Sequence, residues 1–374
     1  MLSCLIFERS AARSGRRPSR LAEDGQVRAV VLEQFRVQPV VCDVPEPSPA
    51  EDGVVVRVEA TGLCRSDWHA FAGHDDDVRL PLIPGHELAG TVLEVGAAVR
   101  RWHPGQRVTV PFVCACGTCS TCRSGQQQVC ERQEQPGFTH PGSYAEQVAL
   151  RYADTNLVEL PDELPAVDAA GLGCRLATAW HALVDVARVR AGEWVVVHGC
   201  GGAGLAILMV ARAAGAQVVA VDLSPDALGL ALELGAAAGL DPAAVPDVPA
   251  AVAELTGGGA HVSVDAAGTP ATLDAGLRCL RRRGTHVQVG LLPARTGRPA
   301  VPMDLVVARE LRILGSHGMA ARSYPALLSA VRSGALDPAQ LVRRRITLDE
   351  APGALAALGS GSTPGITVIE PGAG

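Results

Sequence analysis

The spacing of hydrophobic and polar positions changes part-way along the chain. From Val27 to about Tyr152, short β-rich stretches lie between turns that contain Gly and Pro. The first stretch is an apolar strand at residues 27–32, and the others are Val54–Ala60, Leu88–Val95 and Arg107–Pro111. This pattern predicts an irregular all-β or barrel-like domain.

From about Ala166, apolar strands alternate with amphipathic helices. The predicted strands are Trp194–Gly199, Gln217–Asp222, His261–Asp265, His286–Gly290 and Leu311–Gly315. The predicted helices are Ala203–Ala214, Pro225–Leu234 and Pro270–Arg281. Such alternation is typical of a doubly wound parallel sheet. The tail from about His317 is predicted to be a helix followed by a strand at Ile366–Ile369, which we expect to return to the first domain.

Residues 1–26 differ in composition from the rest of the chain, with five Arg and interleaved Ser after a short apolar start. A targeting segment would have this composition, and so would translated sequence upstream of a true start at Val27. We favour the second explanation, and we expect disorder in either case.

Composition narrows the classes of partner and chemistry. The net charge is −6, and no apolar run reaches the length of a membrane span, so neither nucleic acid nor a membrane is expected as a partner. All 33 basic residues are Arg, which excludes mechanisms that need a lysine. Five of the 11 Cys fall within Cys114–Cys130, which favours metal binding in a reducing compartment, the cytoplasm.

A glycine-rich turn follows the apolar strand at Trp194 and precedes a helix, with the spacing G-x-G-x-x-G. Such a turn lets a pyrophosphate approach backbone N–H groups at the N-terminus of the helix. Asp222 ends the next strand, where an acid binds ribose hydroxyls and disfavours the 2′-phosphate of NADP. The predicted cofactor-binding residues are Gly199, Gly201, Gly202, Ala203, Gly204 and Asp222. An ordinary strand–helix turn with a surface Asp is the alternative.

Four cysteines form the most specific motif in the chain: Cys116, Cys119, Cys122 and Cys130. Four thiolates this close in sequence suit a closed tetrahedral zinc site, which would stabilise a lobe with little core of its own. An iron–sulfur cluster and a chance grouping are the alternatives. Cys114 is interpreted as a strand residue.

Three further residues, Cys64, His86 and Cys174, offer two thiols and one imidazole. This donor set with an open fourth position describes a catalytic zinc site. Spacing alone leaves the question open, because an isolated Cys is commonly a small buried hydrophobe.

Together these motifs resemble the zinc-containing medium-chain dehydrogenases, in the alcohol dehydrogenase branch. The resemblance rests on Cys-Arg-Ser-Asp-x-His at residues 64–69, Gly-His-Glu at 85–87, the four-Cys motif, Cys174 and the glycine turn with Asp222, all in the family's order. It covers nearly all of Val27 to Ile369. It implies a GroES-like β-barrel catalytic domain (residues 27–175 and 318–374) with a structural-zinc lobe, and a Rossmann domain (176–317).

The resemblance also implies residue roles. Cys64, His86 and Cys174 would bind the catalytic zinc, which Glu87 could also reach, and Asp67 would orient His86. Ser66 and His69 match proton-relay positions, Arg65 and Thr178 cofactor contacts, and Phe112 a substrate-pocket position. The chain departs from the family at Ile366, where an Arg toward the cofactor phosphates is common, and Arg65 is expected to compensate. Cys174 is also followed by Arg175, where small residues are more usual.

The implied activity is reversible hydride transfer between a small alcohol and NAD, giving an aldehyde or ketone, with two zinc ions per chain. A homodimer or homotetramer is expected. Two alternatives are a biosynthetic carbonyl reductase using NADH or NADPH, and a non-catalytic, zinc-stabilised nucleotide-binding protein.

Overall fold

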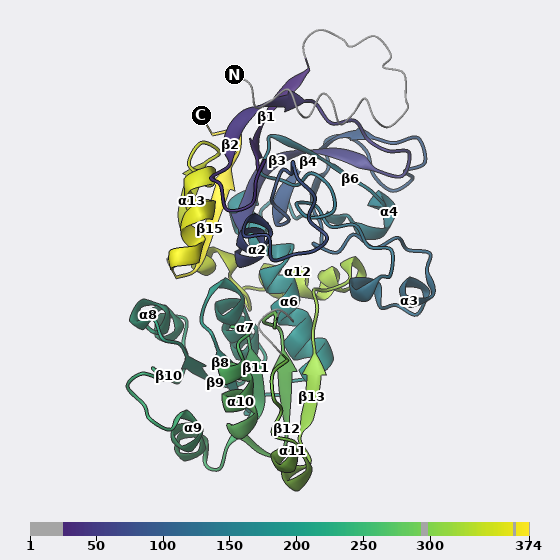
Figure 1. Cartoon of the computed structure of the whole chain (residues 1–374). Helices are drawn as coiled ribbons and strands as arrows, with labels where there is room; N and C mark the ends of the chain where they lie inside the picture. Colours follow the sequence, from purple (N-terminus) through teal and green to yellow (C-terminus); the bar gives the residue numbers. More distant parts are fainter. Residues whose placement is uncertain (1–24, 293–297, 362–363, 374) are drawn as a thin grey trace.

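The computed structural model describes residues 25–292, 298–361 and 364–373. Most of the segment 1–26, for which we expect disorder, lies outside the described residues. Figure 1 shows two domains, one built from the beginning and the end of the chain and the other from its middle. None of the helices in the described ranges is both long and apolar enough to span a bilayer.

The first domain is built on a curved, mostly antiparallel sheet in the order β14-β15-β3-β4-β5-β7, with β6 paired to β3. The strands are β3 (Val54–Leu63), β4 (Leu88–Val95), β5 (Arg107–Thr109), β6 (Gln147–Leu150), β7 (Val158–Glu159), β14 (Val342–Thr347) and β15 (Ile366–Glu370). A separate hairpin is formed by β1 (Gln26–Val31) and β2 (Val40–Pro45). The last strand returns to this domain, because β15 pairs with β3.

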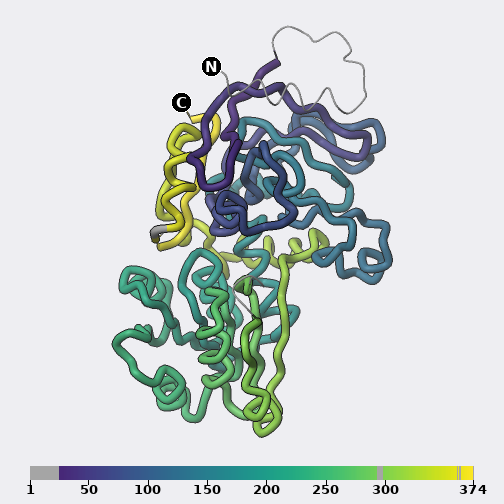
Figure 2. Tube along the Cα trace, in the orientation of Figure 1, coloured from purple at the N-terminus to yellow at the C-terminus, as the bar shows by residue number. Residues whose placement is uncertain are grey.

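Short helices fill the connections of this domain. They are α2 (Arg65–Phe71), α3 (Ser120–Arg123), α4 (Ala153–Asn156), α5 (Ala166–Ala169), α12 (Tyr324–Arg332) and α13 (Ala351–Ala357). The tube in Figure 2 shows the C-terminal segment lying beside the N-terminal one. One apolar core lies under β3, β4 and β6, and another joins β1 to α13.

The second domain is a six-stranded parallel sheet in the order β10-β9-β8-β11-β12-β13. Its strands are β8 (Trp194–His198), β9 (Gln217–Val221), β10 (Ala238–Leu240), β11 (Ala260–Asp265), β12 (Leu280–Gln288) and β13 (Arg312–Gly315). Its helices are α7 (Gly202–Ala213), α8 (Pro225–Glu233), α9 (Val248–Thr256), α10 (Pro270–Arg278) and α11 (Met303–Arg309). This order reverses between β8 and β11, which makes a crevice at the carboxyl ends of the strands.

The predicted fold class, a barrel-like GroES domain with a Rossmann sheet, is confirmed. Two neighbouring boundaries were wrong: the helix predicted to Arg281 ends at Arg278, and β12, predicted to begin at His286, begins at Leu280. The reason is tertiary, because Leu280 pairs with Ala260 of β11.

Helix α9 was not predicted, although the sequence contains the residues that mark its two ends. Asp247 caps its N-terminus by accepting a hydrogen bond from the Ala250 N–H (2.9 Å), Pro249 lies in its first turn, and Gly257 ends it with φ +69°. Strand β14 was missed because the exposed residues Arg343, Arg344 and Arg345 dilute its apolar pattern.

Between the two domains, α6 (Arg175–Trp180) continues into a π-helical segment, His181–Ala187. Helix α6 packs against α7, which directly follows the glycine-rich turn. The segment that follows Cys174 therefore connects the first domain physically to the second.

Candidate active site and structural metal lobe

Cys64, His86 and Cys174, which are far apart in sequence, meet in the first domain. Cys64 follows β3 as the N-cap of α2, His86 precedes β4, and Cys174 is the N-cap of α6. Pairing of β3 with β4 joins the first two, because the Gly62 N–H donates to the Glu87 carbonyl (2.8 Å). The ligand atoms of Cys64, His86, Glu87 and Cys174 all lie within 4.8 Å of one another.

The third stretch is held there by close backbone packing. The Phe112 N–H donates to the Gly173 carbonyl (3.0 Å). A Cβ on Gly173 would lie 2.8 Å from the Val110 carbonyl oxygen, so only glycine allows this approach. Cys174 follows directly and is thereby aimed at the other two donors.

Asp67 ties two of the three stretches together. Its Oδ1 accepts hydrogen bonds from His86 Nδ1 (2.9 Å) and the Gly85 N–H (3.2 Å). Its Oδ2 accepts from the Cys64 N–H (2.9 Å) and the Tyr144 hydroxyl (2.7 Å). Asp67 is fully buried, so its charge is stabilised by these four donors. The orienting role predicted for Asp67 agrees with these contacts.

The free donor atoms fit a metal ion. In the neutral His86 ring, Nδ1 donates its proton to the Asp67 carboxylate and Nε2 carries the lone pair; Nε2 is buried without a hydrogen-bond partner. Burial opposes the charged form of His86, but Asp67 raises its pKa well above the usual value. A hydrogen bond between the two thiols lowers the pKa of Cys64 and raises that of Cys174. Two sulfurs and one imidazole nitrogen are the donors that zinc prefers.

Glu87 is the fourth group, and it is fully buried. Its Oε2 lies 3.0 Å from Arg175 Nη2, an ion pair whose angles leave both carboxylate oxygens without a hydrogen bond. Burial raises the pKa of Glu87 to about 8, and the charge of Arg175 counteracts that rise. Burial opposes the charge of Arg175 in turn, yet Glu87 and the two thiols raise its pKa overall.

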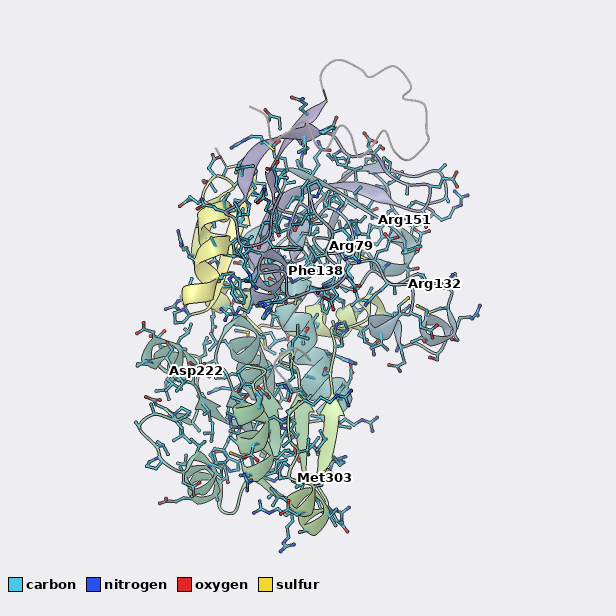
Figure 3. All side chains as sticks on the ribbon, viewed as in Figure 1. Arg79, Arg132, Phe138, Arg151, Asp222 and Met303 are labelled. Atoms are coloured by element: carbon cyan, nitrogen blue, oxygen red, sulfur yellow. The ribbon has the colours of Figure 1, made fainter. Side chains whose placement is uncertain are left out.

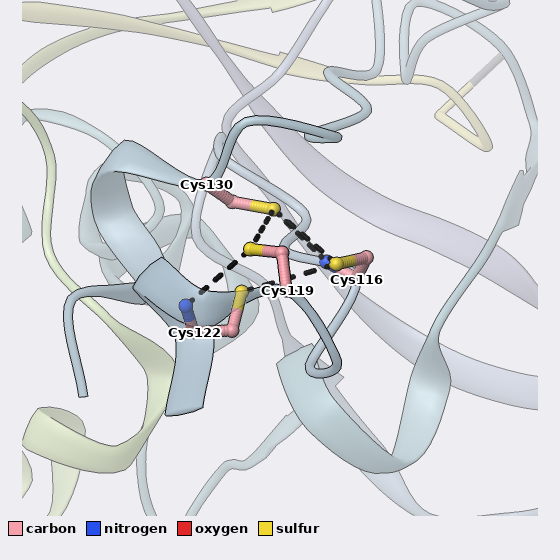
Figure 4. A group of neighbouring side chains, drawn as sticks. All are labelled: Cys116, Cys119, Cys122 and Cys130. Atoms are coloured by element: carbon pink, nitrogen blue, oxygen red, sulfur yellow. Dashed lines mark hydrogen bonds between the residues drawn. The ribbon is translucent and has the colours of Figure 1, made fainter. Parts of the chain in front are cut away.

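The four-cysteine motif forms a separate lobe (Figure 4). Its Sγ atoms are 3.6 Å apart for Cys116 and Cys130, 3.8 Å for Cys119 and Cys130, and 4.0 Å for Cys116 and Cys122. Zn–S bonds of about 2.3 Å in a tetrahedron require sulfurs about 3.8 Å apart, so the lobe fits a zinc ion. Arg132 adds charge compensation, because its Nη2 donates to Cys116 Sγ (3.3 Å).

Cys114 lies outside this group, as expected. Its backbone pairs with that of Glu134 in an isolated antiparallel β-bridge, and burial raises the pKa of its thiol to about 12. Its thiol is therefore a poor ligand.

The glycine-rich turn has the expected geometry at the end of β8. Gly199 has φ +91°, and a Cβ on Gly204 would lie 1.8 Å from the Gly199 carbonyl oxygen, so both positions need glycine. Gly201 faces open space, with nothing within 4 Å of an added Cβ. Asp222 is fixed beside the turn, because it accepts from the Cys200 N–H (2.6 Å) and the Ser224 N–H (2.8 Å). Figure 3 shows Asp222 at the end of the Rossmann domain that lies toward the first domain.

The remaining predicted residues lie on α2 and α6. The Ser66 hydroxyl accepts from Cys64 Sγ at 3.8 Å, and His69, one turn along α2, has its Nδ1 3.1 Å from that of His74. Thr178 is buried, and its N–H donates to the Cys174 carbonyl (2.8 Å). Arg65 contacts the Leu358 carbonyl and the Trp68 ring, both in the first domain, so its cofactor role stays a prediction.

Two aromatic rings lie beside the donor cluster, the name used below for Cys64, His86, Glu87 and Cys174. Phe112, predicted as a pocket residue, has its ring 6.2 Å from His86 and 5.0 Å from His317. Phe138 is closer to His86, at 5.4 Å, and sequence reasoning missed it. It lies in an irregular loop without a motif, so only the tertiary structure reveals it.

Comparison with known proteins identifies the families that the two domains match. Residues 50–162 match the alcohol dehydrogenase GroES-like domain, and residues 202–333 match the zinc-binding dehydrogenase family. An alcohol dehydrogenase of Geobacillus stearothermophilus is 38% identical over 293 residues, covering 78% of this chain and 84% of that protein. The chain belongs to the zinc-containing medium-chain alcohol dehydrogenase family. It is therefore an oxidoreductase with two candidate zinc sites.

Solved structures of this family share the whole two-domain arrangement. A Sinorhizobium meliloti 1021 protein, assigned provisionally to the zinc-binding dehydrogenases and bound to NADP, has a TM-score of 0.85 and 32% identity, covering 93% of this chain and 100% of that one. An NAD-dependent alcohol dehydrogenase has a TM-score of 0.82 and 30% identity, covering 92% and 100%.

Proposed function

We propose that this chain is a zinc-dependent, NAD-linked alcohol dehydrogenase that transfers a hydride between an alcohol and NAD, giving an aldehyde or ketone. The observation that carries the proposal is the convergence of Cys64, His86 and Cys174, with an unpartnered buried Nε2, in a domain joined by α6 to the glycine-rich turn. A merely structural role would not need this second donor set beside the four-cysteine lobe.

Cys64, His86 and Cys174 would hold the catalytic zinc, and Cys116, Cys119, Cys122 and Cys130 the structural one. When bound, zinc supplies Lewis acidity that makes an alcohol acidic, and the nicotinamide supplies the hydride acceptor. Asp67 holds the His86 ring so that Nε2 points into the site. Phe112 and Phe138 place their rings beside His86 and would bind the apolar part of the alcohol.

Ser66 and His69 would move the proton. They lie three residues apart on α2 and therefore on one face of the helix. The Ser66 hydroxyl is beside the donor cluster, and the His69 imidazole is half-buried next to His74. The hydroxyl can accept a proton as it gives its own away, and the imidazole can hold one at neutral pH.

Asp222 supports NAD as the preferred cofactor. Its carboxylate is fixed by two backbone N–H groups beside the turn, where its charge would repel a 2′-phosphate. The related structures include one bound to NADP and one NAD-dependent enzyme, so the choice needs a direct test.

The test measures kcat/KM for NAD⁺ and NADP⁺ with alcohols of graded size, following the absorbance of the reduced nicotinamide. We expect a preference for NAD⁺ that falls at least about tenfold in Asp222→Asn, which removes the charge but keeps the shape. Asp226→Asn, in the first turn of α8, serves as a charge-matched control. Equal use of both cofactors by the wild-type chain would contradict the NAD assignment, and no activity with any alcohol would contradict the reaction class.

The free edge of the Rossmann sheet supports a homo-oligomer. Within the described residues no strand pairs with the outer side of β13, and exposed apolar side chains lie on β13 itself and on α11, which directly precedes it. Val307 is 73% exposed and Met303 55%, and both belong to α11. Figure 3 labels Met303 at the end of the Rossmann domain that points away from the first domain. We propose that two copies pair through this edge, since exposed edges and apolar patches favour association. Val307→Glu should shift the mass measured by light scattering toward the monomer.

A further inference from the structure

Arg175 is a charged residue in an unusual place. It follows Cys174 at the start of α6 and is only 4% exposed. A buried guanidinium is costly unless its charge and its N–H groups are compensated. Its surroundings therefore indicate what it does.

On one side, Arg175 contacts the donor cluster. Its Nη2 donates to the Leu63 carbonyl, directly before Cys64, and lies 3.0 Å from Glu87 Oε2. Both contacts use a single nitrogen of the guanidinium. Because arginine has five N–H donors in a planar fork, further donors remain on Nη1 and Nε.

On the other side, Arg175 lies against the glycine-rich turn of the Rossmann domain. A Cβ on Gly202 would be 2.9 Å from Arg175 Cδ and 3.2 Å from both Nε and Nη1. Gly202 is the first residue of α7, a helix of 12 residues whose N-cap, Gly201, has no side chain to satisfy the first N–H groups. The side of the guanidinium that carries Nη1 therefore borders the helix terminus where a dinucleotide pyrophosphate would bind.

We propose that Arg175 is a cofactor-phosphate ligand, whose Nη2 holds Glu87 while its Nη1 donates to the pyrophosphate of a dinucleotide at the N-terminus of α7. This inference rests on the proposed function, because it requires a dinucleotide at the glycine-rich turn. One fixed positive charge is then shared by the donor cluster and the cofactor. Gly202 has a second reason to be glycine, since any side chain would displace the guanidinium.

The geometry also explains why this position suits Arg. A guanidinium can donate to two anions from two different nitrogens at once, whereas an ammonium is a single point charge on a flexible stem. Ile366, where the family commonly has an Arg, is an apolar residue packed into the core and offers no charge.

The experiment measures equilibrium binding to the zinc-loaded chain of NADH by fluorescence, and of ADP-ribose and adenosine by displacement of NADH. ADP-ribose carries the pyrophosphate without the nicotinamide, and adenosine carries neither. We expect Arg175→Met to weaken NADH and ADP-ribose by about 10–100-fold, with adenosine unchanged within about threefold. Arg175→Lys should fall between wild type and Arg175→Met, which guards against a folding defect in the latter.

Gly202→Ala provides a second, independent variant that keeps the arginine. It should weaken ADP-ribose binding as Arg175→Met does, and the double variant should be no weaker than either alone, because both remove the same contact. Gly229→Ala in α8 is the matched control: an added Cβ there meets nothing within 4 Å, so binding should not change.

Two results are decisive. If wild type binds ADP-ribose and Arg175→Met binds it equally well, the phosphate role of Arg175 is overturned while the proposed function stands. If the wild-type chain binds neither NADH nor ADP-ribose, the proposed function fails, and the inference fails with it.

Discussion

Asp67→Asn tests how the catalytic metal site is held together. The substitution keeps the shape of the side chain but removes its charge and replaces one acceptor oxygen by a donor NH₂. In the wild-type chain, Asp67 accepts four hydrogen bonds, two at each oxygen. Each oxygen accepts one of them from a backbone N–H, that of Gly85 or that of Cys64. Whichever way the amide turns, at least one buried N–H donor meets another donor.

The magnitude follows from two independent arguments. Leaving one buried donor unsatisfied costs about 1–3 kcal/mol. Loss of a carboxylate behind a metal-binding imidazole typically weakens metal binding about 10–100-fold, which corresponds to about 1.4–2.8 kcal/mol. Because the two ranges overlap, we expect one of the two zinc ions to bind about 10–100-fold more weakly in Asp67→Asn.

The assay titrates the protein with a chelator and counts the zinc retained per chain by atomic emission. One step of the curve should move to about 10–100-fold lower chelator concentration, while the step of the four-cysteine lobe stays in place. Asp265→Asn is the matched control. Asp265 is equally buried and accepts from the Ala267 and Gly268 N–H groups and from the Thr272 and Gln288 side chains, but it lies in the Rossmann domain. Asp265→Asn should lower the Tm without moving either step. An unchanged curve for Asp67→Asn, or the same shift in both variants, would refute the reasoning.

Three further predictions concern other parts of the chain. Cys122→Ser should lower the zinc content from two ions to one and reduce the Tm while NADH binding persists, because the lobe is remote from the glycine-rich turn; two retained ions would exclude the lobe as a zinc site. Ser66→Ala should lower turnover about 100-fold with both zinc ions in place, and wild-type turnover would remove Ser66 from the proton path. His198 is fully buried, and burial lowers its pKa from 6.5 to about 4. The unfolded chain therefore binds this proton first as the pH falls below about 6.5, and the folded state loses stability, by roughly 2 kcal/mol between about pH 7 and pH 5. The free energy of unfolding of His198→Phe, measured with urea, should fall less over this interval than that of wild type, and parallel curves would contradict the prediction.

Much of the fold was predictable because the patterns that specify it are local. The alternation of β8, α7 and β9 predicts a parallel sheet, and the observed bounds differ from the predicted ones by a residue at most ends. Elements whose apolar pattern is weak were missed or misplaced. In β12 the exposed residues Arg281, Arg282 and Arg283 follow the end of α10, so sequence periodicity extended the helix into the strand.

The two metal sites also differ in how far local sequence predicts them. The sequence alone determined the four-cysteine lobe and the glycine-rich turn, because all the groups of each lie within one loop, and a short loop brings its own groups together at little entropic cost. Only the tertiary structure decided that Cys64, His86 and Cys174 meet, and that Arg175 lies between Glu87 and Gly202. Those contacts depend on the pairing of β3 with β4, on the close approach of Gly173 to Val110, and on the packing of α6 against α7. Each joins segments distant in sequence, and the burial of whole elements, rather than any local pattern, provides the free energy that holds them together.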